Sequence, residues 1–420
     1  MSSAPARTAE EARHVNRLML FFAIVYVVEG IGQARVGIIY QPLTHYLKEL
    51  SWTPLQVTAY IAVLNFPWVI KPVFGLVSDF VPLLGYRRKS YLIIASLCAI
   101  VGYAGIARLA QPAEFASLLL LTSYAMATAS TLCGALLAEN GQTFRLSSSF
   151  VSQQWLWFYI AIMVSSFAGG ELVERLSGLS ALQVAAAVAA IAPIAVILAS
   201  LFLLSERKSS ASRAELSLTL RSIVIALQSP KLYLVALFLF LYSFAPGFGT
   251  PLYYFMTDDL RFSQSYIGVL GSIASAGWIA GALMHRWLLR RMTSKTLLYF
   301  SIVLGTLSAA SFLLLTNEVT AAIVNFANGV ALMIATIASL TLAADHCPKR
   351  AEGFAFAGLM SIMNLAELLS GNFGAFLYEH VFGNQLGPLI TVSAATTALA
   401  AVLVPLLRLE DRPADGSIPA

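Results

Sequence analysis

The sequence predicts an all-α membrane protein with twelve transmembrane helices in two bundles of six. Apolar residues make up 58% of the 420 residues and charged residues only 11%. The mean hydropathy is +0.77, a value typical of chains embedded in lipid. Apolar runs recur along the whole chain, and the most polar connection, residues 205–230, falls midway. These observations exclude a water-soluble enzyme, a nucleic-acid-binding protein and a single-pass receptor.

Each predicted span is an apolar run of about 20 residues or more, the length that crosses a bilayer as a helix. The first run follows a polar segment with three arginines. It is too long for a signal-peptide core and has no small-residue cleavage site, so we expect it to remain attached. The predicted spans are 18–46, 54–77, 91–110, 115–138, 150–173, 181–204, 231–257, 263–285, 296–316, 319–343, 352–380 and 386–408.

The basic residues predict the orientation. The two tails and the even-numbered loops hold 20 of the 26 Lys and Arg residues. Because cytoplasmic loops collect basic residues, both termini are predicted to be cytoplasmic, and short loops with many alanines favour a bacterial inner membrane. The net charge of +5 therefore reflects topology and indicates no nucleic-acid partner. The expected divisions are a tail at 1–17, a bundle at 18–204, a central loop at 205–230, a bundle at 231–408 and a tail at 409–420.

The two halves share a weak sequence repeat. Trp68 recurs as Trp278, 210 residues later. Pro42-Leu43 recurs as Pro251-Leu252, 209 residues later. An even number of spans in each half makes such a repeat parallel, so the bundles are expected to be related by an axis along the membrane normal, as in the major facilitator fold.

The first span carries an acid at mid-membrane. An ionisable side chain in hydrocarbon costs on the order of 2.5–3.5 kcal/mol, so it calls for a partner, a water-filled cavity or a function. Glu29, Gln33 and Tyr40 fall on one helical face. We interpret this face as the lining of a solute pathway; the alternative is an intramembrane pair between Glu29 and Arg35 that holds helices together. Nearby glycines leave the direction of Arg35 open.

A second acid, Glu367, lies in the eleventh span and shares a face with Asn364. One acid in each half suits proton coupling, with Glu29 as the first choice and Glu367 as the second. The alternative for Glu367 is a protonated side chain that is hydrogen-bonded to a neighbouring helix.

Further candidates lie at three-residue spacing. Asn65, Trp68 and Lys71 would present an amide, a flat aromatic ring and a cation together, which suits an aromatic anion. Alternatively, the Lys71 ammonium extends to the lipid headgroups. Asn325 and Asn328 in the tenth span are candidate ligands or helix–helix contacts.

Two tryptophans at the start of the fifth span, Trp155 and Trp157, are expected in the aromatic belt at the membrane surface. Sequence motifs for nucleotide binding, metalloprotease chemistry, serine hydrolysis or clustered Cys/His metal ligands are not found. We therefore expect neither an enzyme nor a cofactor or metal site.

The segment 68–92 covers the end of the second span and the loop after it, and it contains Lys71-Pro72, Ser78-Asp79 and Gly85-Tyr86-Arg87-Arg88. In this it resembles the folate-biopterin transporter family of the major facilitator superfamily. The resemblance implies that Asp79, Arg87 and Arg88 form a charged gate on the cytoplasmic side.

The resemblance further implies a monomeric secondary transporter, driven by protons, that moves folate or a pterin-like organic anion by alternating access. A carboxylate such as Glu29 can accept the paired N–H groups of a pterin. Trp68 could stack on the ring, and Arg35 and Lys71 are the cations available for carboxylates. A muropeptide or siderophore permease, or a transport-dead sensor on the same fold, remain as alternatives.

Overall fold

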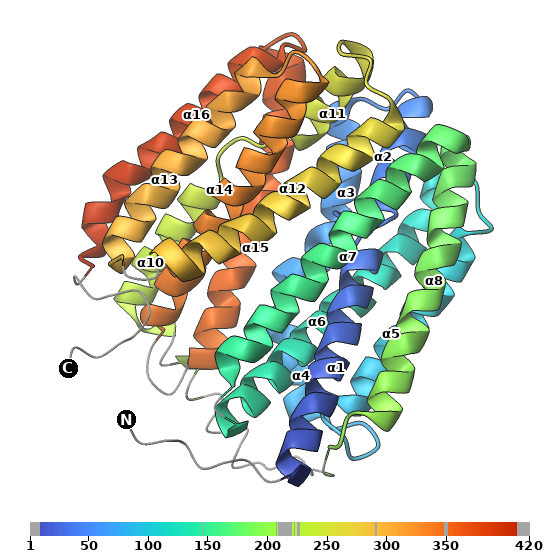
Figure 1. Ribbon diagram of the computed structural model, residues 1–420, viewed down its shortest axis with the longest axis vertical. Helices are drawn as coiled ribbons and strands as arrows, with labels where there is room; N and C mark the ends of the chain where they lie inside the picture. The colour runs from blue at the N-terminus through green and yellow to red at the C-terminus, as the bar shows by residue number, and fades with distance from the viewer. Residues whose placement is uncertain are drawn as a thin grey trace.

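The computed structural model is almost entirely helical and describes residues 9–144, 146–206, 208, 221, 223–224, 227–289, 292–347 and 352–409. Figure 1 shows two groups of long helices, α1 to α8 and α10 to α16, that lean against each other. Most of the predicted central loop and both chain ends lie outside the described residues.

The first half contains eight helices. α1 begins at Ala9, inside the predicted tail, because Glu10 and Glu11 favour the positive end of the helix dipole and make the first turn too polar for a hydropathy window. Thr53 and Gln56 form a capping box in front of α3. The helices are α1 (Ala9–Gly32), α2 (Tyr40–Glu49), α3 (Pro54–Val69), α4 (Lys71–Phe80), α5 (Lys89–Ile106), α6 (Pro112–Phe144), α7 (Ser147–Arg175) and α8 (Gly178–Phe202).

The second half repeats this order. Side-chain caps from Ser229, Ser263, Thr293 and Asn317 begin four of its helices. Its helices are α10 (Pro230–Ser243), α11 (Gly249–Asp258), α12 (Gln264–Met284) continued by η1 (His285–Leu289), α13 (Ser294–Ser311) with η2 (Phe312–Leu314), α14 (Glu318–Asp345), α15 (Glu352–Phe376) with η3 (Leu377–Val381), and α16 (Leu386–Leu403) with η4 (Val404–Leu407).

Over the described residues, 11 helical segments are long and apolar enough to cross a membrane. The shorter apolar helix α10, followed by α11, corresponds to the remaining predicted span. Every predicted span thus has a helical counterpart, and the predicted fold class is confirmed.

Two predicted spans are broken rather than continuous. The first is interrupted at residues 33–39 and the seventh at residues 244–248. A Cβ atom on Gly37 would lie 2.2 Å from the carbonyl oxygen of Ile31, so the first turn is too tight for a side chain there. Irregular backbone at membrane depth is tolerated where protein buries it or where it lines a cavity. The two breaks occupy equivalent places in the two halves, and residues of both, among them Arg35 and Gly247, line a pocket.

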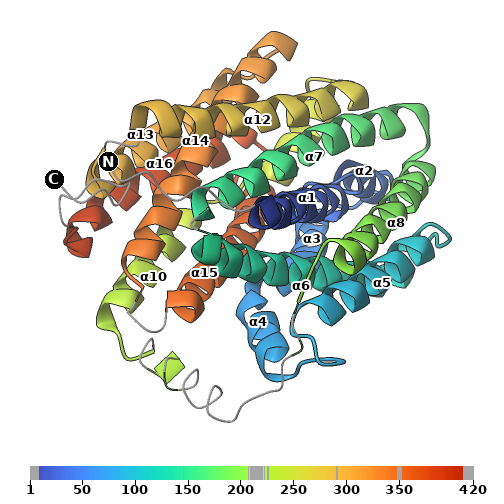
Figure 2. The ribbon, with the colours of Figure 1, turned by 60° about the horizontal axis from the view of Figure 1, so that its bottom comes forward.

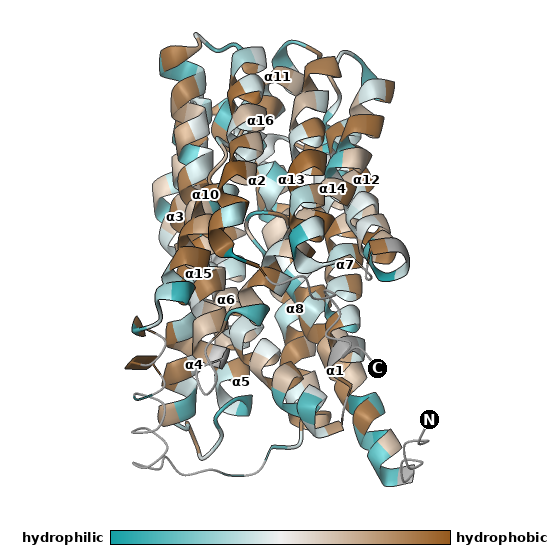
Figure 3. Ribbon diagram, turned by 90° about the vertical axis from the view of Figure 1, so that its left-hand side faces the viewer, coloured by the Kyte–Doolittle hydropathy of each residue, from teal (hydrophilic) through white to brown (hydrophobic). Residues whose placement is uncertain are grey.

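Each half has its own apolar core. Buried residues from Val15 to Leu204 form one cluster, and those from Val235 to Leu407 form two others. Apolar side chains also cover the outer surface, where Figure 3 shows brown helices with teal mostly toward the ends. This surface is suited to lipid. Its strongly exposed apolar residues include Val63, Val101, Ile191, Val303, Leu307, Leu399 and Val402.

The two halves are joined at the end of the molecule that holds α2 and α11, here called the far end (Figure 1). Lys48 forms an ion pair with Asp258, the residue that the 210-residue repeat predicts as its symmetry equivalent. Because both lie beside the axis that relates the halves, equivalent positions meet there. Other contacts at this end link Gln41 to Gln264, His45 to Tyr253, Tyr254 to Trp52, Gln264 to Glu174 and Leu55 to Glu379.

The opposite end, where α1 begins and α16 ends, is here called the terminal end. No hydrogen bond or ion pair joins the two halves there among the residues that the structure describes. In Figure 2, which brings this end forward, α7 lies beside α12 and α3 approaches α15. The hydrogen bonds and ion pairs that join the halves therefore lie at the far end and near mid-membrane, as far as the described residues extend.

The crossing of α7 and α12 depends on two glycines. A Cβ atom on Gly268 would lie 2.9 Å from the Cα atom of Gly170 and 2.6 Å from the carbonyl oxygen of Ser166. The two backbones touch because neither residue has a side chain.

We expect Gly268→Val to push the halves apart at the far end, since overpacking costs about 1–3 kcal/mol. The readout is disulfide formation between cysteines placed at Lys48 and Asp258 in a protein without its native cysteines, and it should fall several-fold. Gly358→Val, at a glycine with no neighbouring atom within 4 Å of a Cβ, is the matched control. Unchanged crosslinking in the Gly268 variant would contradict the close approach.

Candidate functional site

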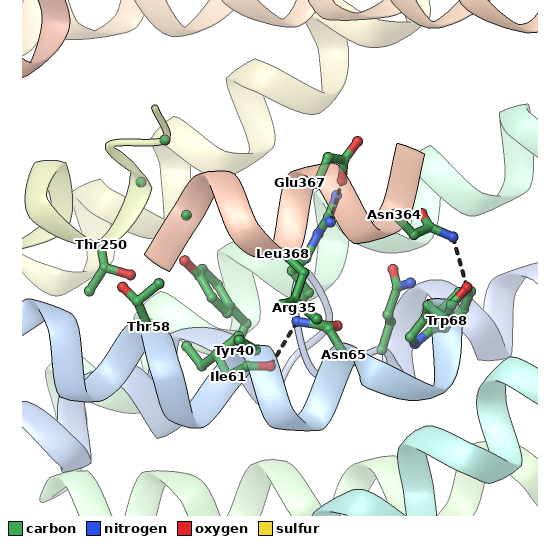
Figure 4. Close-up of a pocket in the computed structure, with 15 residues that line it drawn as sticks. Arg35, Tyr40, Thr58, Ile61, Asn65, Trp68, Thr250, Asn364, Glu367 and Leu368 are labelled. Carbon is green, nitrogen blue, oxygen red and sulfur yellow. Dashed lines mark hydrogen bonds and ion pairs between the residues drawn. The ribbon is translucent and has the colours of Figure 1, made fainter. Parts of the chain in front are cut away.

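A cavity of about 510 Å³ lies between the two halves. The charged side chains in its lining are Glu29, Arg35, Lys71 and Glu367. A neighbouring pocket of about 240 Å³ shares Arg35 and Glu367 with it and is shown in Figure 4. The volume of the larger cavity falls within the range of about 300–1,000 Å³ that holds a drug-sized ligand.

The lining also shows which way the cavity runs. Gln154 near the start of α7 and Leu340 near the end of α14 belong to it, and both lie toward the terminal end. Toward the far end the lining reaches Gln41 and Tyr253, which take part in the contacts that join the halves, and ends near Thr44 and Met256. The cavity therefore extends toward the terminal end, where no inter-half bond is found among the described residues.

An ion pair crosses the cavity between the halves. Arg35 leaves the break at residues 33–39, and its Nη1 atom lies 2.5 Å from Oε2 of Glu367 on α15. Figure 4 shows the two side chains reaching toward each other. Arg35 therefore pairs with Glu367 and not with Glu29, so the Glu29–Arg35 alternative is wrong. Glu367 meets a cation of the other half, a partner that the sequence interpretation did not assign to it.

The other acid and cation of the lining are joined through a hydroxyl. Lys71 donates from Nζ to Ser130 Oγ at 3.1 Å, and Ser130 donates to Glu29 Oε1 at 3.1 Å. Glu29 is only 8% exposed, and its Oε2 atom has no hydrogen-bond partner among the described residues. Within this buried network, one carboxylate oxygen is held by Ser130 while the other has no bond to the described part of the protein.

Aromatic rings line the cavity on two sides. The Lys71 ammonium lies 4.2 Å from the ring centroid of Trp68. On the other side, Tyr159 of α7 stacks on Trp278 of α12 with ring centroids 4.8 Å apart, and on Trp155 at 5.8 Å. The cavity thus offers flat surfaces from both halves.

Two tryptophans of the repeat, Trp68 and Trp278, both line the cavity. The repeat could have suggested Trp278 as a candidate, whereas no sequence signal pointed to Tyr159 or Ser130. Trp155 lines the cavity instead of the predicted membrane belt, because α7 turns it inward onto Tyr159.

The candidate asparagines differ in their surroundings. Asn364 donates from Nδ2 to the Trp68 carbonyl oxygen at 2.9 Å and so joins the halves. Asn65 and Asn325 line the pockets but donate to carbonyl groups of their own helices. Asn328 accepts a bond from Ser308 at 3.1 Å and is not part of the lining. Asn328 is thus a helix–helix contact, and its prediction as a ligand is wrong.

The remaining polar residues of the first-span stripe, Gln33 and Tyr40, line both pockets. They do so although the helix predicted to carry them is broken between α1 and α2. The structure thus brings them to the same cavity as Glu29, Arg35, Trp68 and Lys71.

The charged loop after α4 forms a cluster within the first half. Arg88 is 5% exposed; its Nη2 atom lies 2.7 Å from Asp79 and 3.0 Å from Glu139, and Nη1 donates to Ser78 at 2.5 Å. Arg88 therefore fastens the end of α4 to α6. No hydrogen bond or ion pair between this cluster and the second half is found in the described part of the chain.

The sequence interpretation missed the partner of the adjacent backbone. The Glu206 carboxylate accepts from the amides of Arg87, Arg88 and Lys89 at 2.9, 3.0 and 2.8 Å. These amides lie at the start of α5, where four N–H groups have no partner within the helix. The gate role of Asp79, Arg87 and Arg88 stays a prediction.

The family of the chain follows from a match over most of its length. The sequence profile of the BT1 family matches residues 32–409. The chain belongs to the BT1 family. It is therefore a membrane transport protein and not an enzyme, and the resemblance to folate-biopterin transporters is confirmed.

Curated relatives of this BT1-family protein cover most of its length. The folate-biopterin transporter of Synechocystis sp. is 28% identical over 415 residues, which cover 94% of this chain and 82% of that protein. Folate transporter 2 of Plasmodium falciparum is 25% identical over 370 residues, which cover 84% of this chain and 79% of that protein.

Solved structures share the fold of this BT1-family protein. The nucleoside transporter NupG has a TM-score of 0.68 with 16% identity, and the match covers 94% of this chain and 98% of that one. A D-xylose-proton symporter has a TM-score of 0.69 with 12% identity, and the match covers 93% of this chain and 97% of that one. At these identities the likeness shows the major facilitator fold alone.

Arg88 and Arg87 of this BT1-family protein provide a test of the charge cluster. Arg88→Gln should lower the melting temperature by several degrees, because it leaves Asp79 and Glu139 without their shared cation. Arg87→Gln is the matched control, since the Arg87 side chain has no hydrogen bond or ion pair among the described residues. Equal melting temperatures of the two purified variants would contradict this assignment.

Proposed function

We propose that this BT1-family protein is a secondary active transporter that moves folate or a pterin-like organic anion together with protons. The observation that carries the proposal is the cavity between the halves, which combines two cations, two acids and aromatic rings. The relatives named as folate or folate-biopterin transporters support the choice of cargo.

The cargo chemistry matches the lining. A pteridine ring is flat and aromatic, so Trp68 on one side and the stacked Tyr159 and Trp278 on the other are suited to it. The carboxylates of a folate tail need cations, and Arg35 and Lys71 are the cations of the lining. Gln33, Tyr40, Asn65, Asn325 and Asn364 would supply polar contacts to the ring edge.

Proton coupling is assigned to Glu29 first. Its charge is balanced by Lys71 through Ser130. If an anionic cargo draws the Lys71 ammonium toward itself, Glu29 loses its counter-charge in a buried place and favours the protonated form. Anion binding and proton binding would then support each other, as a symporter requires. Glu367 is the second choice, because Arg35 balances its charge.

The orientation follows from the basic loops, which assign the terminal end to the cytoplasm. The cavity would then face the cytoplasm in this structure, and alternating access would close the terminal end while the far-end contacts separate. We propose that Asp79, Arg87 and Arg88 form a gate that holds the terminal end closed in the opposite state of the transport cycle. We further propose a monomer in a bacterial inner membrane.

Glu29→Gln should abolish accumulation of labelled folate in vesicles that are acidic outside, because glutamine cannot gain or lose the coupled proton. Exchange against preloaded folate should continue, since the aromatic rings and cations of the cavity remain. Glu171→Gln, which alters a partly exposed acid that pairs with Arg175 outside the cavity lining, is the control and should accumulate folate normally. If the Glu29→Gln variant accumulates folate as well as the wild-type protein does, Glu29 is not the coupling residue.

Trp68→Leu should raise the Kd for folate about tenfold, because aromatic stacking on a heterocycle contributes on the order of 1–3 kcal/mol. Trp52→Leu is the control, since Trp52 packs against Tyr60 outside the cavity lining. Binding to the purified protein is measured for folate, 6-hydroxymethylpterin, a muropeptide and an iron chelate. Binding of the muropeptide or the iron chelate, with no binding of folate or 6-hydroxymethylpterin, would contradict the proposed cargo.

A further inference from the structure

The Arg35–Glu367 ion pair has features that a purely structural pair does not need. Its two side chains are 49% and 39% exposed, and both line both pockets. A solute in the cavity can therefore reach the pair. By contrast, Glu29 is 8% exposed and held within the network of Ser130 and Lys71.

The Arg35 guanidinium also has donors to spare. It carries five N–H donors, and the hydrogen bond found for it within the described residues is the one from Nη1 to Glu367 at 2.5 Å. Arginine can hold a carboxylate through two parallel hydrogen bonds. The present single bond therefore leaves Arg35 able to accept a better-aligned carboxylate.

The backbone explains why Arg35 can act in this way. It lies in the break at residues 33–39 and points across the cavity to α15 of the other half. The carboxylate that it meets belongs to the chain itself and has the same chemistry as a carboxylate of a solute.

We propose that Arg35 is a carboxylate-binding subsite, occupied by Glu367 when the cavity is empty and by a carboxylate of the cargo during transport. This inference rests on the proposed function and narrows its substrate class to pteridines that carry a carboxylate. Exchanging one carboxylate for another keeps the charge of Arg35 balanced. The displaced Glu367 stays hydrated, since it is already partly exposed to the cavity.

Displacement would also release a link between the halves. The pair joins the first half to α15, and the nearby bond from Asn364 to the Trp68 carbonyl is another contact at that level. A cargo without a carboxylate leaves the Arg35–Glu367 link in place. Neutral pterins should therefore be poorer substrates than their carboxylated counterparts.

The decisive variant is Glu367→Gln. It removes the carboxylate that competes with the cargo for Arg35, so a carboxylated pterin should bind more tightly. In the purified full-length protein, the Kd for 6-carboxypterin should fall about tenfold, while the Kd for 6-hydroxymethylpterin should not change. These ligands share the ring and differ in the carboxylate. Arg35→Gln should raise the Kd for 6-carboxypterin about tenfold and leave that of 6-hydroxymethylpterin unchanged.

Glu379→Gln is the matched control. Glu379 lies on the same helical segment as Glu367 and also contacts the first half, through the Leu55 amide, but it is not part of the cavity lining. It should shift neither Kd. If Glu367→Gln does not fold, Glu367→Asp, whose shorter side chain loosens the pair, should change the same Kd in the same direction.

Two results would contradict the subsite: equal changes in the Kd of both pterins in the Glu367→Gln variant, or no change in either Kd.

If no pteridine binds the wild-type protein, the proposed cargo is wrong. The subsite is then tested separately with p-aminobenzoylglutamate, which has carboxylates without the pterin ring. It should raise the melting temperature of Glu367→Gln but not that of Arg35→Gln/Glu367→Gln. Equal melting temperatures with and without it in both variants would then reject the subsite as well.

Discussion

An ionisable side chain inside a membrane costs on the order of 2.5–3.5 kcal/mol unless it meets a partner or water, and the interior of this protein is arranged around that cost. Its cavity lining contains two acids and two cations, which occur as two balanced sets. Glu29 and Lys71 are linked through Ser130 within the first half, whereas Arg35 and Glu367 meet across the halves. Glu29 can gain or lose a proton without a change in the contacts between the bundles. Arg35 and Glu367, by contrast, cannot separate without the loss of a contact that joins the bundles.

The same cost applies to the backbone. Unpaired amide and carbonyl groups are excluded from lipid, so irregular segments occur at membrane depth only where protein or a cavity surrounds them. The breaks at residues 33–39 and 244–248 obey this rule, and they occupy equivalent positions in the two halves. The first break carries Arg35, which reaches Glu367 of the other half. The second packs against α15, where the Gly247 amide donates to the Ser370 carbonyl at 3.0 Å.

The polar contacts between the halves are distributed unevenly, and this bears on alternating access. At the far end they include the Lys48–Asp258 ion pair and the bond from Gln41 to Gln264. At the terminal end the ion pairs and side-chain hydrogen bonds of Arg88 all lie within the first half, as far as the described residues show. A transporter must separate one end while it closes the other. The far-end contacts would break in that exchange, while the Arg88 cluster could move as a unit with its bundle.

Hydropathy and charge were enough to predict the helical membrane fold and the presence of two acids within its spans. Both are local properties, and each span is long enough to be recognised without knowing its neighbours. The repeat also anticipated the relation between Trp68 and Trp278, both of which line the cavity.

The partners of these residues, by contrast, follow from tertiary packing alone. Arg35 and Glu367 are separated by 332 residues, and no periodicity within a helix indicates which faces of two distant helices will meet. For the same reason Asn325 and Asn328, equally plausible in sequence, differ in that only Asn325 reaches the cavity. The helix break that frees Arg35 was also out of reach, because it depends on cavity and protein contacts that satisfy its backbone, and these exist only once the two halves have packed around their common axis.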